Sequence, residues 1–436
     1  MADVGEPAGG RPREGGRPAE DVVALCSRLI RFDTSITGEF ERGCAELVAE
    51  ELAAMGLQPQ VLESQPRRSN VVARVTGSDP TAPAVLVHIH LDVVPADPGE
   101  WTVPPFSGEV RDGQVWGRGA VDMKNMAAMT LVALRERLAA GWRPRRDVVL
   151  AFVSDEERGG ADGAGWLVER HPELFEDCTE AVGEAGGFSH EYAPGRRAYS
   201  VQTGEKGIAW LHLVARGRGG HGALQRDSSA VSAIADAVSR LSSHRFDAKP
   251  TPSTTELLSW AASWTEDEEP LRAFGPLARL LDPALRHTYN ATGLAAGQQH
   301  NVVPSFARAS IDGRVVPGHE DDFVRELLEV VGDAVTVEVV QRSTGVEAPF
   351  TGLVPDAIRR ALQRADPGSL TVPTLLPIST DAKHFSRLGI GCFGFAPMRT
   401  PLGYDFASMF HGVDERVPIS ALVFGERVME HFFEEC

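Results

Sequence analysis

Cysteine is scarce in this chain of 436 residues, and the few cysteines are scattered. None of them forms a Cys-x-x-Cys pair: they are Cys26, Cys44, Cys178, Cys392 and Cys436. This spacing argues against a disulfide framework and against a zinc site built from thiolates. Reduced thiols are typical of intracellular proteins, so we expect a cytoplasmic location.

The chain also lacks long apolar runs and an excess of basic residues. No run approaches the ~20 apolar residues that cross a membrane, so we expect no membrane partner. Lys and Arg number 43 against 61 Asp and Glu, and the net charge of -18 argues against nucleic acid as a partner. This charge suits a protein that gathers divalent cations. Residues 1–18 have no apolar core and are interpreted as a disordered tail rather than a signal peptide.

What the sequence does contain is a series of short apolar strands that alternate with helical segments. Continuous apolar runs at 85–92 and 147–154 flank a helical stretch at 125–140. Fully apolar strands of this kind indicate an α/β fold, with a mostly parallel sheet covered by helices on both faces. The length of the chain favours two domains. From about 204 the order becomes β-α-β-β-α-β, the ferredoxin-like pattern, which predicts an inserted α+β domain at 204–343 within a first domain at 19–203 and 344–436.

Charged side chains and histidines cluster where these strands are expected to end. The candidate metal ligands are His90, Asp122, Glu157, Glu184 and His411. Two histidines and three carboxylates suit two Zn²⁺ ions that share a bridging carboxylate, with a water or hydroxide between them. Glu156, beside Glu157, is placed to take a proton from that water and return it to the leaving group.

Each of these residues also has an ordinary structural interpretation. A histidine in an apolar strand is more often a hydrogen-bonded core residue, and this remains the interpretation of His88. The run Asp155-Glu156-Glu157 by itself is typical of a solvated turn, and Asp381 of a helix cap. The metal-site hypothesis is favoured because all the ligand types occur together.

Five motifs carry a resemblance to the M20 family of zinc peptidases and deacylases. They are His90-x-Asp92, Gly117-Arg118-Gly119-x-x-Asp122-x-Lys124, Asp155-Glu156-Glu157-x-Gly159-Gly160, Gly219-Gly220-His221-Gly222 and His411-x-x-Asp414-Glu415. They occur in the order of the family, and the resemblance covers the chain from about residue 19 to the end. It implies a zinc-exopeptidase-like catalytic domain and an inserted lid and dimerisation domain.

The resemblance also implies a role for each site residue. His90 and Glu184 would bind one zinc ion, and Glu157 and His411 the other. Asp122 would bridge them, and a cis peptide often follows this residue in the family. Asp92 would support the site, and Glu156 would be the general base and acid. Co²⁺ or Mn²⁺ are possible substitutes for the two Zn²⁺ ions.

Three further residues are expected to act on the substrate by the same resemblance. His221 would reach the active site of a neighbouring subunit and stabilise the oxyanion, so a homodimer is expected. Asn301 and Arg314 match lid positions that hold a substrate carboxylate, which suits the two parallel donors of arginine. Their alternative interpretation is local: each could pair with Asp312 or cap a turn.

The expected reaction is hydrolysis of an amide bond next to a free carboxylate, in a small peptide or an N-acyl amino acid. The segment 395–398 and the insertion at 251–282 are similar to the branch containing carboxypeptidase S and N-acyl-amino-acid hydrolases. Two alternatives are a dedicated biosynthetic deacylase, of the acetylornithine or succinyl-diaminopimelate type, and a catalytically silent binding relative. A purely structural zinc conflicts with the carboxylate-rich ligand set.

Four residues depart from the family pattern and are hypothesised to narrow the pocket or tune the choice of substrate: Ile89, Asn125, Ala185 and Ser379.

Overall fold

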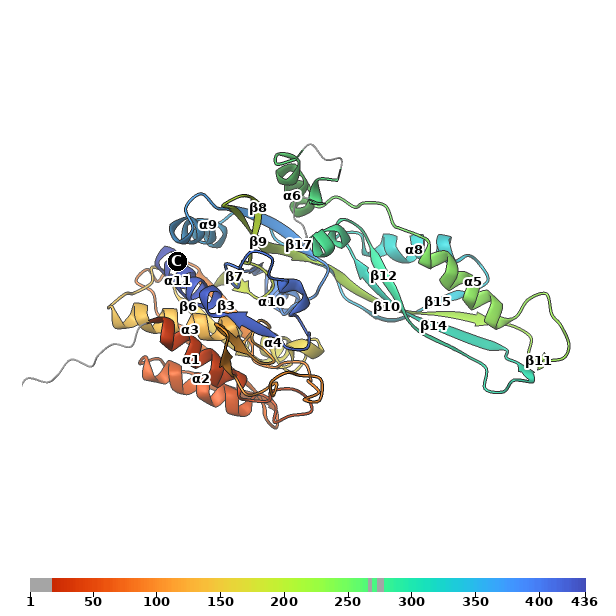
Figure 1. The fold of residues 1–436 in the computed structure, drawn as a ribbon, viewed down its shortest axis with the longest axis horizontal. Helices are drawn as coiled ribbons and strands as arrows, with labels where there is room; N and C mark the ends of the chain where they lie inside the picture. The colour runs from red at the N-terminus through yellow and green to blue at the C-terminus, as the bar shows by residue number, and fades with distance from the viewer. Residues whose placement is uncertain (1–17, 266–268, 273–277) are drawn as a thin grey trace, which may run out of the picture.

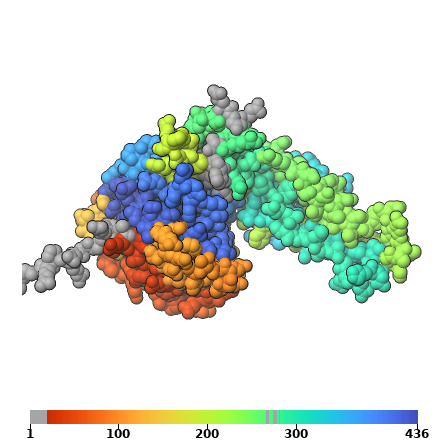
Figure 2. Space-filling model, viewed as in Figure 1, coloured from red at the N-terminus to blue at the C-terminus, as the bar shows by residue number. Residues whose placement is uncertain are grey.

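The computed structural model describes residues 18–265, 269–272 and 278–436. Residues 1–17, most of the predicted disordered tail, lie outside this described part. Figure 1 shows a broad body of sheet and helices with a long arm projecting from it, and Figure 2 shows the same arm as a separate mass beside the body. None of the described helices is long and apolar enough to cross a membrane.

The body is built on a large mixed sheet whose centre is parallel. The strand order is β1-β2-β6-β3-β7-β18-β9-β16, and β8 and β17 also pair with β9. The strands are β1 (Gln60–Gln65), β2 (Arg68–Val75), β3 (Ala84–His90), β6 (Val148–Val153), β7 (Cys178–Gly183), β8 (Ser189–Ala193), β9 (Arg196–Glu205), β16 (Val346–Glu347), β17 (Leu370–Leu376) and β18 (Gly391–Gly394). Strand β3 runs parallel to both β6 and β7, and β18 runs parallel to β7. The carboxyl ends of these strands therefore meet at one edge, where ligands bind in such sheets.

Helices cover both faces of this sheet, as the apolar strands predict. One hydrophobic cluster contains residues of α1 (Pro18–Ile30), α2 (Arg42–Ala54), α3 (Lys124–Ala139), α9 (Leu353–Ala365) and α11 (Ile419–Glu435). A second, on the opposite face, contains residues of α4 (Ala164–Arg170) and α10 (Ala382–Phe385). A small sheet beside the body is formed by β4 (Val110–Arg111), β5 (Gln114–Trp116) and β19 (Arg416–Pro418). Short 3₁₀ turns are η2 (Pro172–Leu174), η5 (Ser386–Leu388) and η6 (Phe406–Ser408).

Strand β3 contributes to both clusters because its side chains alternate between the faces of the sheet. Val87 and Ile89 belong to the first cluster, and Leu86 belongs to the second. Ile89 is 0% exposed. The hypothesis that Ile89 narrows the substrate pocket is therefore wrong, because its side chain is in the hydrophobic core and not at the site.

The arm is a four-stranded antiparallel sheet with two helices on one face. The strands are β10 (Gly207–Arg216), β12 (Thr288–Ala296), β14 (Phe306–Val315) and β15 (Thr336–Arg342), in the order β12-β14-β10-β15. Helices α5 (Ala230–Ser242) and α8 (Glu320–Val331) pack together on it. Two short strands, β11 (Gly220–His221) and β13 (Val302–Val303), pair at the far tip of the arm (Figure 1).

One segment of the predicted inserted domain packs on the body instead of on the arm sheet. It contains α6 (Pro252–Ala262), α7 (Ala278–Leu281) and η4 (Asp282–Leu285). Leu257 and Ala261 of α6 share a hydrophobic cluster with Ala198 of β9 and Val372 of β17. The boundaries at 204 and 343 stay a prediction, but this stretch within them lies over the large sheet.

Candidate metal centre

His90 ends strand β3 with its imidazole directed at the carboxylates of two other segments. The residue is 1% exposed. Its Nδ1 donates a hydrogen bond to the carbonyl oxygen of Asp92 at 3.0 Å, because a carbonyl oxygen can only accept, and Nε2 faces the site. Nε2 lies 3.0 Å from Asp122 Oδ1 and 3.4 Å from Glu184 Oε2.

Asp122 reaches the site from the loop between β5 and α3, and a buried glutamate holds this loop. Glu415 is 0% exposed. Its carboxylate accepts hydrogen bonds from the backbone of Gly119, Val121 and Asp122 and from the side chain of Arg118. The Asp122–Met123 peptide is cis. The two carboxylate oxygens of Asp122 face two different histidines, Oδ1 facing His90 and Oδ2 facing His411.

Glu156 and Glu157 lie in a single 3₁₀ turn, η1 (Glu156–Arg158), directly after β6. The turn begins at Asp155, whose φ of 69° belongs to the left-handed region. The backbone N–H groups of Glu156 and Glu157 donate to Oδ1 and Oδ2 of Asp92, each at 3.1 Å. Asp92 therefore supports the site by holding this turn.

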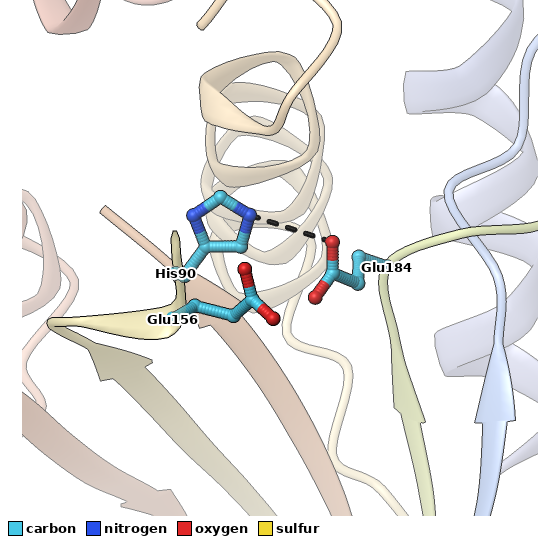
Figure 3. A group of neighbouring side chains, drawn as sticks. All are labelled: His90, Glu156 and Glu184. Atoms are coloured by element: carbon cyan, nitrogen blue, oxygen red, sulfur yellow. Dashed lines mark ion pairs between the residues drawn. The ribbon is translucent and has the colours of Figure 1, made fainter. Parts of the chain in front are cut away.

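The set is completed by residues at the end of β7 and from the loop before β19. Glu184 directly follows β7, and its Oε1 is buried without a hydrogen-bond partner among the described residues. His411 Nε2 lies 3.0 Å from Glu157 Oε2 and 3.4 Å from Asp122 Oδ2. Figure 3 shows Glu156 and Glu184 directed toward His90 from neighbouring strand ends.

Two overlapping groups in this cluster have ligand atoms close enough to hold an ion. His90, Asp122 and Glu157 form one, and His90, Glu156 and Glu184 form the other; within each group the ligand atoms lie within 4.8 Å of one another. Nitrogen and carboxylate donors are those that Zn²⁺ accepts in catalytic sites. Buried carboxylates at this density are costly unless cations compensate them. The residues present therefore fit a divalent metal ion, and the unpartnered oxygen of Glu184 offers a free ligand atom.

The proton affinities of these groups reflect the same crowding. Burial raises the pKa of Glu156 well above its ordinary value, and the nearby carboxylate of Glu184 raises it further. Burial would also raise the pKa of Asp122, but hydrogen bonds with His411 and His90 hold this pKa well below its ordinary value. Hydrogen bonds with Asp122 and Glu157 raise the pKa of His411 to about 10. The histidines thus serve as countercharges when protonated, and a metal ion would replace their protons.

The three residues expected to act on the substrate are not part of this cluster within the chain. His221 is exposed in β11, at the tip of the arm, where its Nδ1 accepts a hydrogen bond from the backbone of Ala223. Asn301 is exposed beside it. Arg314 donates to both oxygens of Asp312, at 2.9 and 3.1 Å, which is the local interpretation of this residue.

Two buried residues near the cluster were not predicted to belong to it: Asp381, interpreted from the sequence as a helix cap, and Glu205. Asp381 is 1% exposed, and both of its carboxylate oxygens lack a hydrogen-bond partner among the described residues. Burial raises its pKa to about 8. Glu205 accepts from the backbone and the hydroxyl of Thr380, and so holds the turn that carries Asp381. In the sequence, Asp381 follows Ser-Thr and precedes a short helix. This pattern is too common to predict a buried carboxylate without hydrogen-bond partners.

Comparison with known proteins agrees with this geometry. The profile of peptidase family M20/M25/M40 matches residues 86–435. The chain belongs to this family. It is 30% identical to the N-fatty-acyl-amino acid synthase/hydrolase of Xenopus tropicalis, over 92% of this chain and 83% of that protein. It is also 30% identical to a probable carboxypeptidase S-like protein of Dictyostelium discoideum, over 79% of this chain and 70% of that one.

A solved structure supports the fold. The M20 family metallo-carboxypeptidase Sso-CP2 of Sulfolobus solfataricus superposes with a TM-score of 0.70 at 21% identity, over 95% of this chain and 98% of that one. The α/β fold with a central sheet covered by helices is thereby confirmed. As a member of this metal-dependent family, the chain is a hydrolase of amide bonds of the peptidase or acylase kind.

Proposed function

We propose that this chain is a dinuclear zinc hydrolase that cleaves an amide bond next to a free carboxylate, in an N-acyl amino acid or a small peptide. The observation that carries the proposal is the position of Asp122. Its Oδ1 lies 3.0 Å from His90, and its Oδ2 lies 3.4 Å from His411. A carboxylate whose two oxygens face different ligand groups is suited to bridge two ions.

The roles of the other residues follow from their positions around Asp122. Glu184 lies on the side of His90, and Glu157 on the side of His411, so each ion would have one histidine and one further carboxylate. When bound, the two ions would polarise the substrate carbonyl and make an attacking water more acidic.

Glu156 is the proposed proton carrier. It belongs to the same turn as Glu157, and its carboxylate approaches His90 and Glu184 (Figure 3). Burial and the negative charge of Glu184 raise its pKa. A carboxylate with a raised pKa is a stronger base toward water, and once protonated it can donate to the leaving amine.

The substrate class is inferred from the relatives, whose names refer to N-fatty-acyl-amino acids and to a carboxypeptidase. N-acyl amino acids and the peptides that a carboxypeptidase cleaves both carry a free carboxylate beside the amide bond. The guanidinium of Arg314 can bind such a carboxylate with two parallel hydrogen bonds if it leaves Asp312. His221 would complete the site from a second copy of the chain.

The test has two independent measurements. Metal analysis of the purified protein should find close to two zinc ions per chain, and one ion or none would contradict the dinuclear site. A panel of N-acyl amino acids and dipeptides, each with a matched amide in place of the free carboxylate, should be hydrolysed only in the carboxylate form. A chelator should abolish this activity, and added Zn²⁺ should restore it. Equal hydrolysis of the two forms would contradict the proposed substrate class.

A further inference from the structure

Arg68 is a buried cation that lies outside the ligand cluster. It begins strand β2 and is 5% exposed. Its Nη1 donates to Glu41 Oε1 at 2.7 Å, and its Nη2 lies 3.2 Å from Asp155 Oδ1. The guanidinium also lies over the ring of Phe40, 4.7 Å from the ring centroid. A charge buried to this extent is retained only when its partners compensate it.

Asp155 connects this cation to the turn η1 (Glu156–Arg158), called the catalytic turn below because it carries Glu156 and Glu157. Its carbonyl oxygen accepts hydrogen bonds from the backbone of Arg158 and Gly160, at 3.1 and 2.7 Å. One oxygen of its side chain accepts from the backbone of Asp162 at 3.0 Å, and the other faces Arg68. The side chain of Asp155 therefore closes the loop that contains Glu156 and Glu157.

The catalytic turn is thus held from two sides. Asp92 binds the backbone N–H groups of Glu156 and Glu157, and Arg68 binds the carboxylate of Asp155, which directly precedes them. Asp155 has a left-handed backbone, a conformation that a residue with a side chain rarely adopts unless its surroundings hold it. The ion pair with Arg68 is one of the contacts that hold it.

The electrostatic surroundings explain why an arginine suits this position. Glu41 is 0% exposed, and its other oxygen, Oε2, has no partner among the described residues. Two nitrogens of one planar guanidinium can serve Glu41 and Asp155 at once, whereas the ammonium of a lysine is a single point of charge. Without this cation both carboxylates would remain buried and would lose the ion pair that compensates their charge.

We propose that Arg68 is a positioning residue that sets Glu156 and Glu157 through Asp155, although it contacts neither substrate nor metal ligands. The role rests on the proposed function, because Glu157 is the proposed ligand of one ion and Glu156 the proposed base. Loss of Arg68 would release Asp155 from its left-handed conformation and move the turn. The ion on the side of Glu157 and His411 would bind more weakly, and proton transfer by Glu156 would slow.

Arg67 offers a matched control. It is exposed and lies over the same ring of Phe40, 4.8 Å from the centroid. Replacing either arginine removes a cation from one end of β2 and from the same aromatic contact. A difference between the two variants therefore reports the contacts with Glu41 and Asp155.

The experiment compares Arg68→Lys, Arg68→Met and Arg67→Met with the wild-type protein loaded with zinc. Chelator titration should show that one of two ions is bound about 10- to 100-fold more weakly in both Arg68 variants. kcat should fall by a similar factor while KM changes less than about threefold, because the arm residues proposed to bind substrate are untouched. Arg67→Met should leave both measurements unchanged.

A second variant, Asp155→Asn, keeps the shape of the side chain and guards against a failure of Arg68→Met to fold. It should reproduce the Arg68→Lys effect, and the double variant should be no worse than either single one, because both remove the same contact. The proposal is overturned if Arg68→Lys and Asp155→Asn keep wild-type metal affinity and kcat, or if they lower thermal stability alone.

The outcomes also separate this proposal from the proposed function. If the wild-type protein binds two ions but hydrolyses no compound of the panel, the proposed function fails, and the chelator titration still decides the role of Arg68. If the wild-type protein is active and the Arg68 variants match it in metal affinity and kcat, the role of Arg68 fails alone. A wild-type protein that binds no metal would overturn both.

Discussion

The body and the arm present their predicted site residues in opposite ways. In the body, His90 and Asp122 are 1% and 8% exposed and lie 3.0 Å apart. In the arm, His221 of β11 and Asn301, which directly precedes β13, are exposed. Strand β11 lies at the tip of the arm, away from the body (Figure 1). Carboxylates in a buried cluster have lost their hydration and need compensating cations in the folded chain. Exposed side chains stay hydrated until a partner binds. The difference indicates that one chain brings the proposed metal ligands together by itself, whereas the proposed substrate contact of His221 would need a second copy of the chain.

The largest effect is expected at the body site, from Glu156→Gln. The amide cannot accept the proton of the attacking water, so kcat should fall by about 10²–10⁴-fold. Zinc content should stay the same, because Glu156 is not one of the proposed ligands. The matched variant Glu157→Gln should instead lose metal. Retention of turnover in Glu156→Gln would remove it as the base.

In the arm, His221→Ala tests whether a second subunit completes the site. The variant should lose about 10²-fold in kcat, as expected for removal of an oxyanion donor, with zinc content and thermal stability unchanged because the side chain is exposed. A mixture of His221→Ala and Glu156→Gln chains, refolded together, should regain activity. In mixed dimers one site would combine an intact Glu156 with the intact His221 of the other chain. Absence of such recovery would contradict the shared site.

Lys206 lies where body and arm join, between β9 and β10, and gives a smaller, pH-dependent effect. It is 1% exposed, and its Nζ donates to Thr288. Burial, and then the charge of Arg286, lower its pKa to about 7. Below pH 7 both the folded and the unfolded chain carry the charge, so the full cost of burying it is present. Between pH 7 and the ordinary pKa of 10.5 the unfolded chain holds more protons, and stability rises with pH.

Lys206→Met should therefore stabilise the protein most near pH 6.5, by about 1–3 kcal/mol, and least near pH 10. Urea unfolding of the variant and the wild type at both pH values measures this difference. Lys249→Met is the control, because Lys249 forms an ion pair with Glu326 at 2.6 Å and should gain nothing from the substitution. A gain in Lys206→Met that is the same at both pH values would contradict the assignment.

The smallest effect is expected from Ala185→Gly, directly after Glu184. Ala185 has a φ of 69°, in the region that glycine adopts freely. Glycine would relieve this strain but would also make the unfolded chain more flexible, so the two changes largely cancel. The midpoint of urea unfolding should change by less than the equivalent of about 1 kcal/mol. A larger loss of stability would mean that the methyl group of Ala185 makes packing contacts that glycine cannot replace.

The sequence predicted more of the body's chemistry than of its architecture. The strands β3 and β6 were predicted because each is a nearly continuous apolar run, and the ligands at their ends followed. Strand β9 was missed, since it buries Ser200, Gln202 and Glu205 among its residues and so shows no apolar pattern. Strands β8 and β17 were also missed. Such strands are stabilised by pairing with segments far away in the chain, which local patterns do not reveal.

The sequence by itself determined which residue types stand at the strand ends and in what order, and therefore which chemistry and which family were expected. Only the tertiary structure decided which of them meet. It places Ile89 in the core and Arg68 beside Asp155, and it places Glu415 where its carboxylate binds the backbone of the loop that carries Asp122. The physical reason is that ligand types are local properties of the chain, whereas a buried charge finds its partner through the order of strands in the sheet.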